Sequence, residues 1–184
     1  MANIRNIFNS IQDKNRKLKI CLLHFDQKYE TLLAKTGHDF YIVTSEDNPW
    51  DDKSSDTPDN FYLLKGNMSD TIAFDMIICG GRFTNNANIA NQIRSRFRVP
   101  CLFYENAQPW SFNPEFKCLE DIPKRYLQML QQTSGDVNIF SSDEIEKSWS
   151  SITNNNLVVP YGDGLEDKFL TEWETVLTNF KEIQ

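Results

Sequence analysis

Several short apolar runs of this sequence end in polar residues that could bind a ligand. The segments placed in this way are His24 to Gln27, Thr44 to Glu46, Gly80 to Arg82, Glu105 to Gln108 and Ser141 to Asp143. They supply hydrogen-bond donors, acceptors and accessible backbone. The candidate ligand-binding residues within them are His24, Asp26, Gly80, Gly81, Arg82, Glu105, Asn106, Ser141 and Ser142. The pattern assigns no catalytic residue.

Each candidate has a ligand-binding and a structural interpretation. The pair Gly80-Gly81 permits positive φ and close approach to a phosphate or a sugar ring, but it also suits a tight turn. His24 suits a general base or a hydrogen-bond partner, and Asp26 is the carboxylate beside it in the sequence. Glu105-Asn106 suits recognition of sugar hydroxyls, or a loop that caps a helix. Both interpretations stay open.

The sequence lacks the motifs of several common enzyme classes and metal sites. The first apolar run leads into His24 to Gln27, where a dinucleotide-binding strand would lead into GxGxxG, and Walker A, GxSxG, HExxH and CxxC patterns are also missing. We therefore expect no NAD, no other cofactor and no metal. Cys21, Cys79 and Cys101 lie in apolar runs, which predicts buried, reduced thiols. A net charge of -7 disfavours nucleic acid as a partner.

The apolar runs predict the elements that position the candidate residues. Strand-like runs are Leu18–Leu23, Phe40–Val43, Phe61–Leu64, Met76–Cys79, Val99–Tyr104, Val137–Phe140 and Leu157–Val159. Helical spacing alternates with them over Gln27–Lys35, Ile89–Phe97, Ile122–Gln132, Ser142–Trp149 and Leu165–Ile183. This alternation predicts an α/β fold, a single Rossmann-like three-layer sandwich with a mainly parallel sheet. The candidate segments would then share the carboxyl edge of that sheet.

The length of 184 residues suits one domain. We expect an N-terminal extension over 1–17, the Rossmann-like domain over 18–164, and an amphipathic helix over 165–184 that packs on the same domain. No apolar run approaches the roughly 20 residues that span a membrane, and no secretory signal is recognisable at the start. We therefore expect a cytoplasmic protein with no membrane span.

Three groups of segments, taken in order, resemble the N-terminal domain of retaining GT-B glycosyltransferases. The first joins Lys19–Leu23 to Gly37–Val43, similar to the family's first strand and its "GH-x-V" second strand. The second consists of Phe74–Cys79 and Val99–Tyr104, similar to a strand that follows an aspartate and a strand entered by Val-Pro. The third is Asp136–Ser142, then Val158–Asp163 and Phe169, similar to a "D-x-hydrophobic-x-x-S" strand and the interdomain linker. The resemblance extends from Leu18 to Phe169.

The sequence departs from that family after its linker-like segment. Pro160–Asp163 leads to Thr171–Leu177, similar to the closing helix of such enzymes, where the family has a second domain that binds the sugar nucleotide. Glu166 and Glu174 match a family spacing by position, but we assign them no catalytic role. The resemblance implies an acceptor-side half that binds a sugar or glycosyl acceptor and does not transfer alone.

Three functions remain open. The chain could complete a glycosyltransferase with a separate donor-domain protein or as a homodimer. It could be a non-catalytic carbohydrate- or nucleotide-binding module. It could be a flavodoxin- or receiver-like regulatory interaction domain, although Asp75 precedes its strand and Gly80-Gly81 occupies the strand end where a receiver carries its aspartate.

Overall fold

The computed structural model describes residues 16–45, 48–51, 57–64, 72–81, 85–133 and 135–183. Its strands are β1 (Lys19–Leu23), β2 (Asp39–Val43), β3 (Phe61–Leu64), β4 (Met76–Gly80), β5 (Cys101–Glu105), β6 (Val137–Phe140) and β7 (Asn156–Val158). Its α-helices are α2 (Gln27–Leu33), α3 (Asn86–Phe97), α4 (Lys124–Gln132), α5 (Asp143–Trp149) and α6 (Glu166–Ile183). Short 3-10 helices are η1 (Ala34–Thr36) and η2 (Leu119–Asp121).

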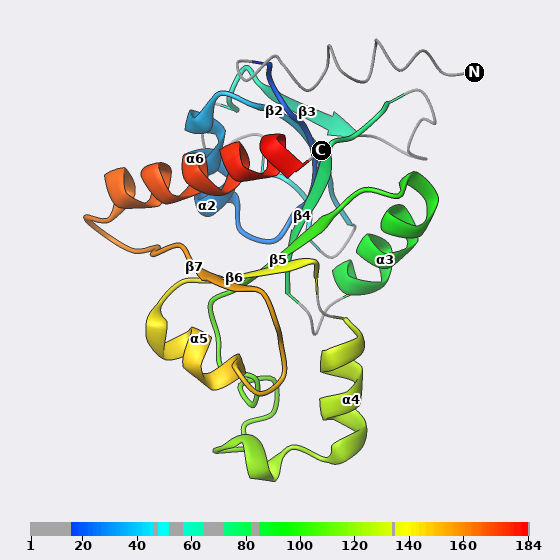
Figure 1. Cartoon of the computed structure of the whole chain (residues 1–184), viewed down its shortest axis with the longest axis vertical. Helices are drawn as coiled ribbons and strands as arrows, with labels where there is room; N and C mark the ends of the chain where they lie inside the picture. The colour runs from blue at the N-terminus through cyan, green and yellow to red at the C-terminus, as the bar shows by residue number, and fades with distance from the viewer. Residues whose placement is uncertain are drawn as a thin grey trace.

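The strands form one 7-stranded sheet in the order β3-β2-β1-β4-β5-β6-β7 (Figure 1). Every neighbouring pair is parallel. This confirms the predicted single α/β, Rossmann-like fold. The chain builds the sheet outward from β1 in one direction and from β4 in the other, so the strand order reverses between β1 and β4. Parallel sheets bind ligands beyond the carboxyl ends of the strands at such a reversal.

Helices cover both faces of the sheet (Figure 1). Alternate residues of the central strands, such as Leu22 and Ile78, pack with α2 and α6 on one face. The residues between them, such as Leu23 and Cys79, pack with α3 on the other face. Because both faces are covered, the central strands are apolar along their whole length rather than alternating.

The helices α4 and α5 lie on the same face of the sheet as α3. They share a cluster in which Leu130 and Trp149 pack around Phe140 of β6. Phe140 lies two residues after Asn138, which pairs with Phe103 of β5, and residues two apart in a strand share a face. Phe103 belongs to the cluster beneath α3, so this face carries three helices and the opposite face carries α2 and α6.

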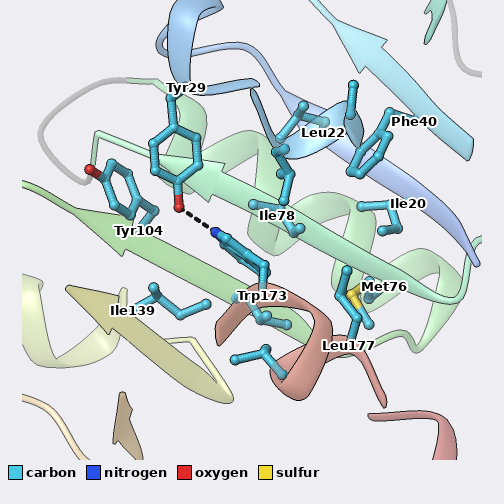
Figure 2. Packing of buried hydrophobic residues seen from close by; sticks show 14 of the residues in the cluster. Ile20, Leu22, Tyr29, Phe40, Met76, Ile78, Tyr104, Ile139, Trp173 and Leu177 are labelled. Atoms are coloured by element: carbon cyan, nitrogen blue, oxygen red, sulfur yellow. Dashed lines mark hydrogen bonds between the residues drawn. The ribbon is translucent and has the colours of Figure 1, made fainter. Parts of the chain in front are cut away.

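The helix α6 returns over the sheet and packs beside α2. Figure 2 shows Trp173 buried among residues of β1, β4 and β5, with its indole Nε1 donating a hydrogen bond of 2.9 Å to the Tyr29 hydroxyl. Phe169 and Tyr29 meet edge to face with ring centroids 4.9 Å apart. These contacts hold α6 against α2. No helix among the described residues is long and apolar enough to cross a bilayer.

Local chemistry sets where the predicted elements begin and end. Gly37 ends the first helical segment with a left-handed φ of 77°, as the sequence predicts, although the last turn before it is a 3-10 turn. The helix predicted from Ile122 begins at Lys124, because Pro123 is extended with a ψ of 139°. The predicted burial of the strand cysteines is confirmed, and burial raises the pKa of Cys21 to about 12.

Candidate functional site

A cavity of about 470 Å³ lies at the carboxyl ends of β1, β2, β4 and β5. It opens where the strand order reverses between β1 and β4. Loops after these strands and the first turn of α3 form its walls. The described residues that line it are Phe25, Asp26, Ser45, Asn48, Gly80, Gly81, Asn85, Asn86, Ile89, Tyr104 and Asn106. Most are small, amide-bearing or aromatic, which suits a polar ligand with an apolar face.

Two carboxylates fix the turn between β1 and α2. Asp26 is the N-cap of α2, and its Oδ1 accepts a hydrogen bond of 2.9 Å from the Tyr29 backbone N–H. The Oε1 of Glu30 reaches back to accept from the backbone N–H groups of Phe25, at 2.7 Å, and of Asp26, at 3.2 Å. Three backbone N–H groups at this turn, those of Phe25, Asp26 and Tyr29, are thereby bound within the protein.

His24 faces the protein interior rather than the cavity. It is 5% exposed, and its Nδ1 lies 2.6 Å from Oε2 of the fully buried Glu30. Its ring packs on Trp50 with centroids 5.3 Å apart. Burial raises the pKa of Glu30, and the hydrogen bond to His24 opposes that shift. In this arrangement His24 positions the turn after β1.

The backbone carbonyl of His24 also joins the walls of the cavity to each other. It accepts hydrogen bonds from Nδ2 of Asn48, at 3.1 Å, and from Nδ2 of Asn86, at 3.0 Å. Asn48 follows β2 and Asn86 begins α3. The end of β1 therefore anchors the loops on both sides of it.

Gly80 provides space for an aromatic side chain. A Cβ atom on Gly80 would lie 2.6 Å from Cγ of Phe25, closer than any real contact. Phe25 lies over this strand end and stacks on Tyr104 with centroids 5.4 Å apart. The glycine thus serves the packing of Phe25 in the cavity wall. Gly81 has a φ of 74°, which glycine adopts without strain.

Tyr104 of β5 lines the cavity, and its hydroxyl is buried within the protein. The residue is 3% exposed, and its hydroxyl makes no hydrogen bond of normal geometry to the described residues. Burial raises the pKa of Tyr104, the neighbouring carboxylates of Asp26 and Glu105 add to the increase, and the Ser141 side chain opposes it. The hydroxyl is therefore a neutral phenol at ordinary pH, able to donate or accept.

Only some of the ligand-binding residues predicted from the sequence line the cavity. Asn106 is exposed and lines the cavity with Asp26, Gly80 and Gly81. His24, Glu105, Ser141 and Ser142 do not line it, and Arg82 lies outside the described residues.

The polar residues at the ends of β5 and β6 make hydrogen bonds within the fold. Glu105 is 5% exposed and pairs with Phe140 in the sheet, and its backbone carbonyl accepts a hydrogen bond of 3.1 Å from the Ser141 N–H. Ser142 is the N-cap of α5, and its hydroxyl accepts from the Ile145 N–H at 3.3 Å.

Sequence reasoning missed Glu30, Asn48, Asn86 and Tyr104. The signal for Glu30 is its position four residues after the capping Asp26, from which a carboxylate can reach back to the turn. The sequence indicates for Tyr104 only a place in an apolar strand. Nothing in the sequence singles out Asn48 or Asn86, because their contact is with a backbone carbonyl distant in the chain.

A second hollow of about 390 Å³ lies between α2 and the chain that leads into α6. Its lining includes Lys28, Leu32, Lys35, Tyr161, Gly162 and Glu166. Beside this hollow, the side chains of Lys28 and Asp163 form an ion pair of 3.6 Å. Because the Asp163 side chain is fully exposed, the pair contributes little to the stability of the fold. Within the described residues, no three His, Cys, Asp or Glu side chains are grouped as metal ligands.

The fold resembles that of a GT-B glycosyltransferase. The solved structure of sucrose-phosphate synthase from Thermosynechococcus elongatus matches with a TM-score of 0.59 at 12% sequence identity. The match covers 82% of this chain and 49% of the synthase chain, so this chain spans about half the length of the synthase. At this identity the similarity establishes the fold alone. No protein-family model and no curated protein matches the sequence.

Proposed function

We propose that the chain is the acceptor-side half of a GT-B-like glycosyltransferase, which binds a sugar or glycosyl acceptor and does not transfer a sugar by itself. The cavity at the reversal of strand order carries this proposal, since it lies where folds of this class bind ligands and presents amides, a carboxylate and aromatic rings. The GT-B-like fold supports it.

The charges around the cavity support binding rather than transfer. Sugar transfer from a nucleotide donor needs positive groups that stabilise the departing diphosphate. Among the described residues that line the cavity, the one charged side chain is Asp26. A separate donor-domain protein, or a second copy of this chain, would supply the missing groups across the cleft.

One observation favours a non-catalytic binding module as the second candidate. His24, whose side chain suits a general base or a hydrogen-bond partner, is buried against Glu30 instead of facing the cavity. A receiver-like regulator has less support, because Asp75 precedes β4 and is bound by Arg16 at 2.8 Å, at the sheet edge opposite the cavity.

Titration calorimetry of the purified chain tests the proposal. We expect binding of free sugars or glycosides, weak or no binding of UDP- and GDP-sugars, and no sugar transfer unless a partner chain is added. Tight binding of a nucleotide sugar by the isolated chain would contradict the acceptor-side assignment. Transfer by the isolated chain would contradict it as well.

A further inference from the structure

We propose that the N-terminal extension covers the outer face of β2 and β3 with four apolar side chains, those of Ile4, Ile7, Phe8 and Ile11. The outer face is the side of these two strands that is turned away from α2 and α6. Its residues are Tyr41, Val43, Tyr62 and Leu64. None of these four residues lines the cavity, so the inference does not depend on the proposed function.

Alternation along the two strands creates the outer face. Phe40 and Ile42 of β2 are fully buried in the cluster beneath α2 and α6, whereas Tyr41 and Val43 point to the opposite side and are half-buried. Parallel pairing places Tyr62 of β3 beside Tyr41 in the same way. Two neighbouring strands at one end of the sheet therefore turn apolar side chains to the same side.

The described helices leave this surface partly open. Tyr41, Val43 and Leu64 lie at the margin of the cluster beneath α3, which packs on β4 farther along the sheet. The rings of Tyr41 and Tyr62 stack with centroids 5.0 Å apart, and Tyr62 is still 44% exposed. A contiguous apolar surface of this kind indicates a contact with another segment or another molecule.

The described chain begins beside the outer face. Arg16 donates two hydrogen bonds, of 2.9 and 2.8 Å, to the Asp75 carboxylate, which holds the chain at the amino edge of the sheet. The Lys17 ammonium lies 3.9 Å from the Asp39 carboxylate. Asp39 begins β2 and points to the same side as Tyr41, two residues later. The extension therefore joins the domain at the end of β2 that borders the outer face.

The sequence before Arg16 contains one row of large apolar residues. Ile4, Ile7, Phe8 and Ile11 recur at intervals of three and four residues, the spacing that places side chains on one face of a helix. The other residues between Ile4 and Ile11 are all polar. This pattern is typical of a helix that packs one side on an apolar surface, and the outer face is the exposed apolar surface beside which the extension starts.

The connection is long enough for this contact. Residues 12–16 join Ile11 to Lys17, and an extended chain over this distance reaches roughly 20 Å. A strand of the length of β2 spans about 17 Å, and neighbouring strands lie about 4.8 Å apart, so the whole outer face is within reach. A short tether also gives a local concentration on the order of millimolar, which favours the extension over a second copy of the chain.

NMR of the full chain with labelled isoleucine methyl groups tests the inference. We expect nuclear Overhauser effects between the methyl groups of Ile7 or Ile11 and the rings of Tyr41 and Tyr62. In a mixture of labelled and unlabelled chains, we expect none of these effects to pass between chains. Effects that do pass between chains would show that a second copy covers the face, and would overturn the proposal. Absence of the effects in the fully labelled chain would overturn it as well.

Thiol labelling of Tyr62→Cys, read at position 62 by mass spectrometry, gives a second measurement. Ile7→Asp with Phe8→Asp puts charge into the apolar row, so we expect the thiol to react at least about tenfold faster than with the natural extension. Asn6→Asp with Asn9→Asp adds the same charge between the apolar positions and should leave the rate unchanged. Equal rates in the two double variants would contradict the proposal, because another segment would then cover position 62 or nothing would.

Discussion

Glu30 holds the turn after β1 through hydrogen bonds to His24, Phe25 and Asp26. Its replacement by alanine leaves the buried His24 ring and the part-buried N–H groups of Phe25 and Asp26 without this partner. We expect Glu30→Ala to lower the free energy of unfolding by about 3 to 5 kcal/mol, and Glu30→Gln by less, since the amide keeps one acceptor oxygen. Urea unfolding measures both. The exposed Glu174→Ala is the control, and a Glu30→Ala protein as stable as this control would refute the positioning role.

A second prediction concerns the single residue Gly80. An added Cβ would overlap the Phe25 ring, so we expect Gly80→Ala to cost about 1 to 3 kcal/mol and to weaken sugar binding by displacing Phe25. Combining it with Phe25→Leu should recover part of the stability. Gly162→Ala is the matched control, because the nearest side-chain atom there lies at an ordinary 3.7 Å. Thermal unfolding that shows equal effects at the two glycines would contradict this account.

The aromatic groups of α2, β5 and the segment before α6 predict a response to alkaline pH. Burial raises the pKa of Tyr29 and Tyr104 above 10.0, and burial with nearby Asp26 and Asp163 raises the pKa of Tyr161 to about 12. Because the pKa of each of these tyrosines is higher in the folded state, each neutral hydroxyl contributes to stability below the unfolded pKa near 10. This contribution is lost as the pH rises through the pKa of the folded state. Stability should therefore fall above about pH 10.

Tyrosinate absorbance during an alkaline titration checks this prediction. We expect the absorbance of Tyr29, Tyr104 and Tyr161 to appear only together with unfolding, which circular dichroism follows. If all the tyrosines ionise near pH 10 while the protein stays folded, the packing of this cluster is not as described.

The helix α6 is the element that closes the face above α2. Trp173 is fully buried and bonded to Tyr29, so we expect Trp173→Ala to cost about 3 to 5 kcal/mol. Trp173→Phe should cost less, chiefly by leaving the Tyr29 hydroxyl unpaired. The exposed Thr175→Ala is the control. Denaturant unfolding should remain a single transition, and a separate early transition in Trp173→Ala would show that α6 folds independently.

The elements were more predictable from the sequence than the site. Apolar runs such as Met76–Cys79 are short and end in glycine, and helices such as 143–149 begin after a capping serine, so local rules identify them. The placement of His24 is different. Its environment depends on Glu30 and Trp50, which the fold brings together, and no spacing rule predicts which way a histidine at a strand end will turn.

At the scale of the whole molecule, the order of the strands explains why a cavity exists at all. The connections from β1 and from β4 leave the sheet toward opposite faces, so their loops diverge and leave space between them. The sequence predicted the edge on which candidate residues would gather. It could not predict that Asp26, Gly80, Gly81 and Asn106 line the cavity while Ser142 caps a helix, because both roles use the same residue types at the same edge.

The central claim is that a sugar binds in the cavity at the carboxyl ends of β1 and β4. Amide NMR spectra of the isotope-labelled chain test it most directly. They are recorded while the free sugar that binds most tightly in the calorimetric titration is added. We predict shifts that grow with occupancy at Asp26, Gly81 and Asn106, and unchanged signals at Gly162 and Lys35 beside the second hollow. Shifts confined to that second hollow, or to α4, would contradict the claim.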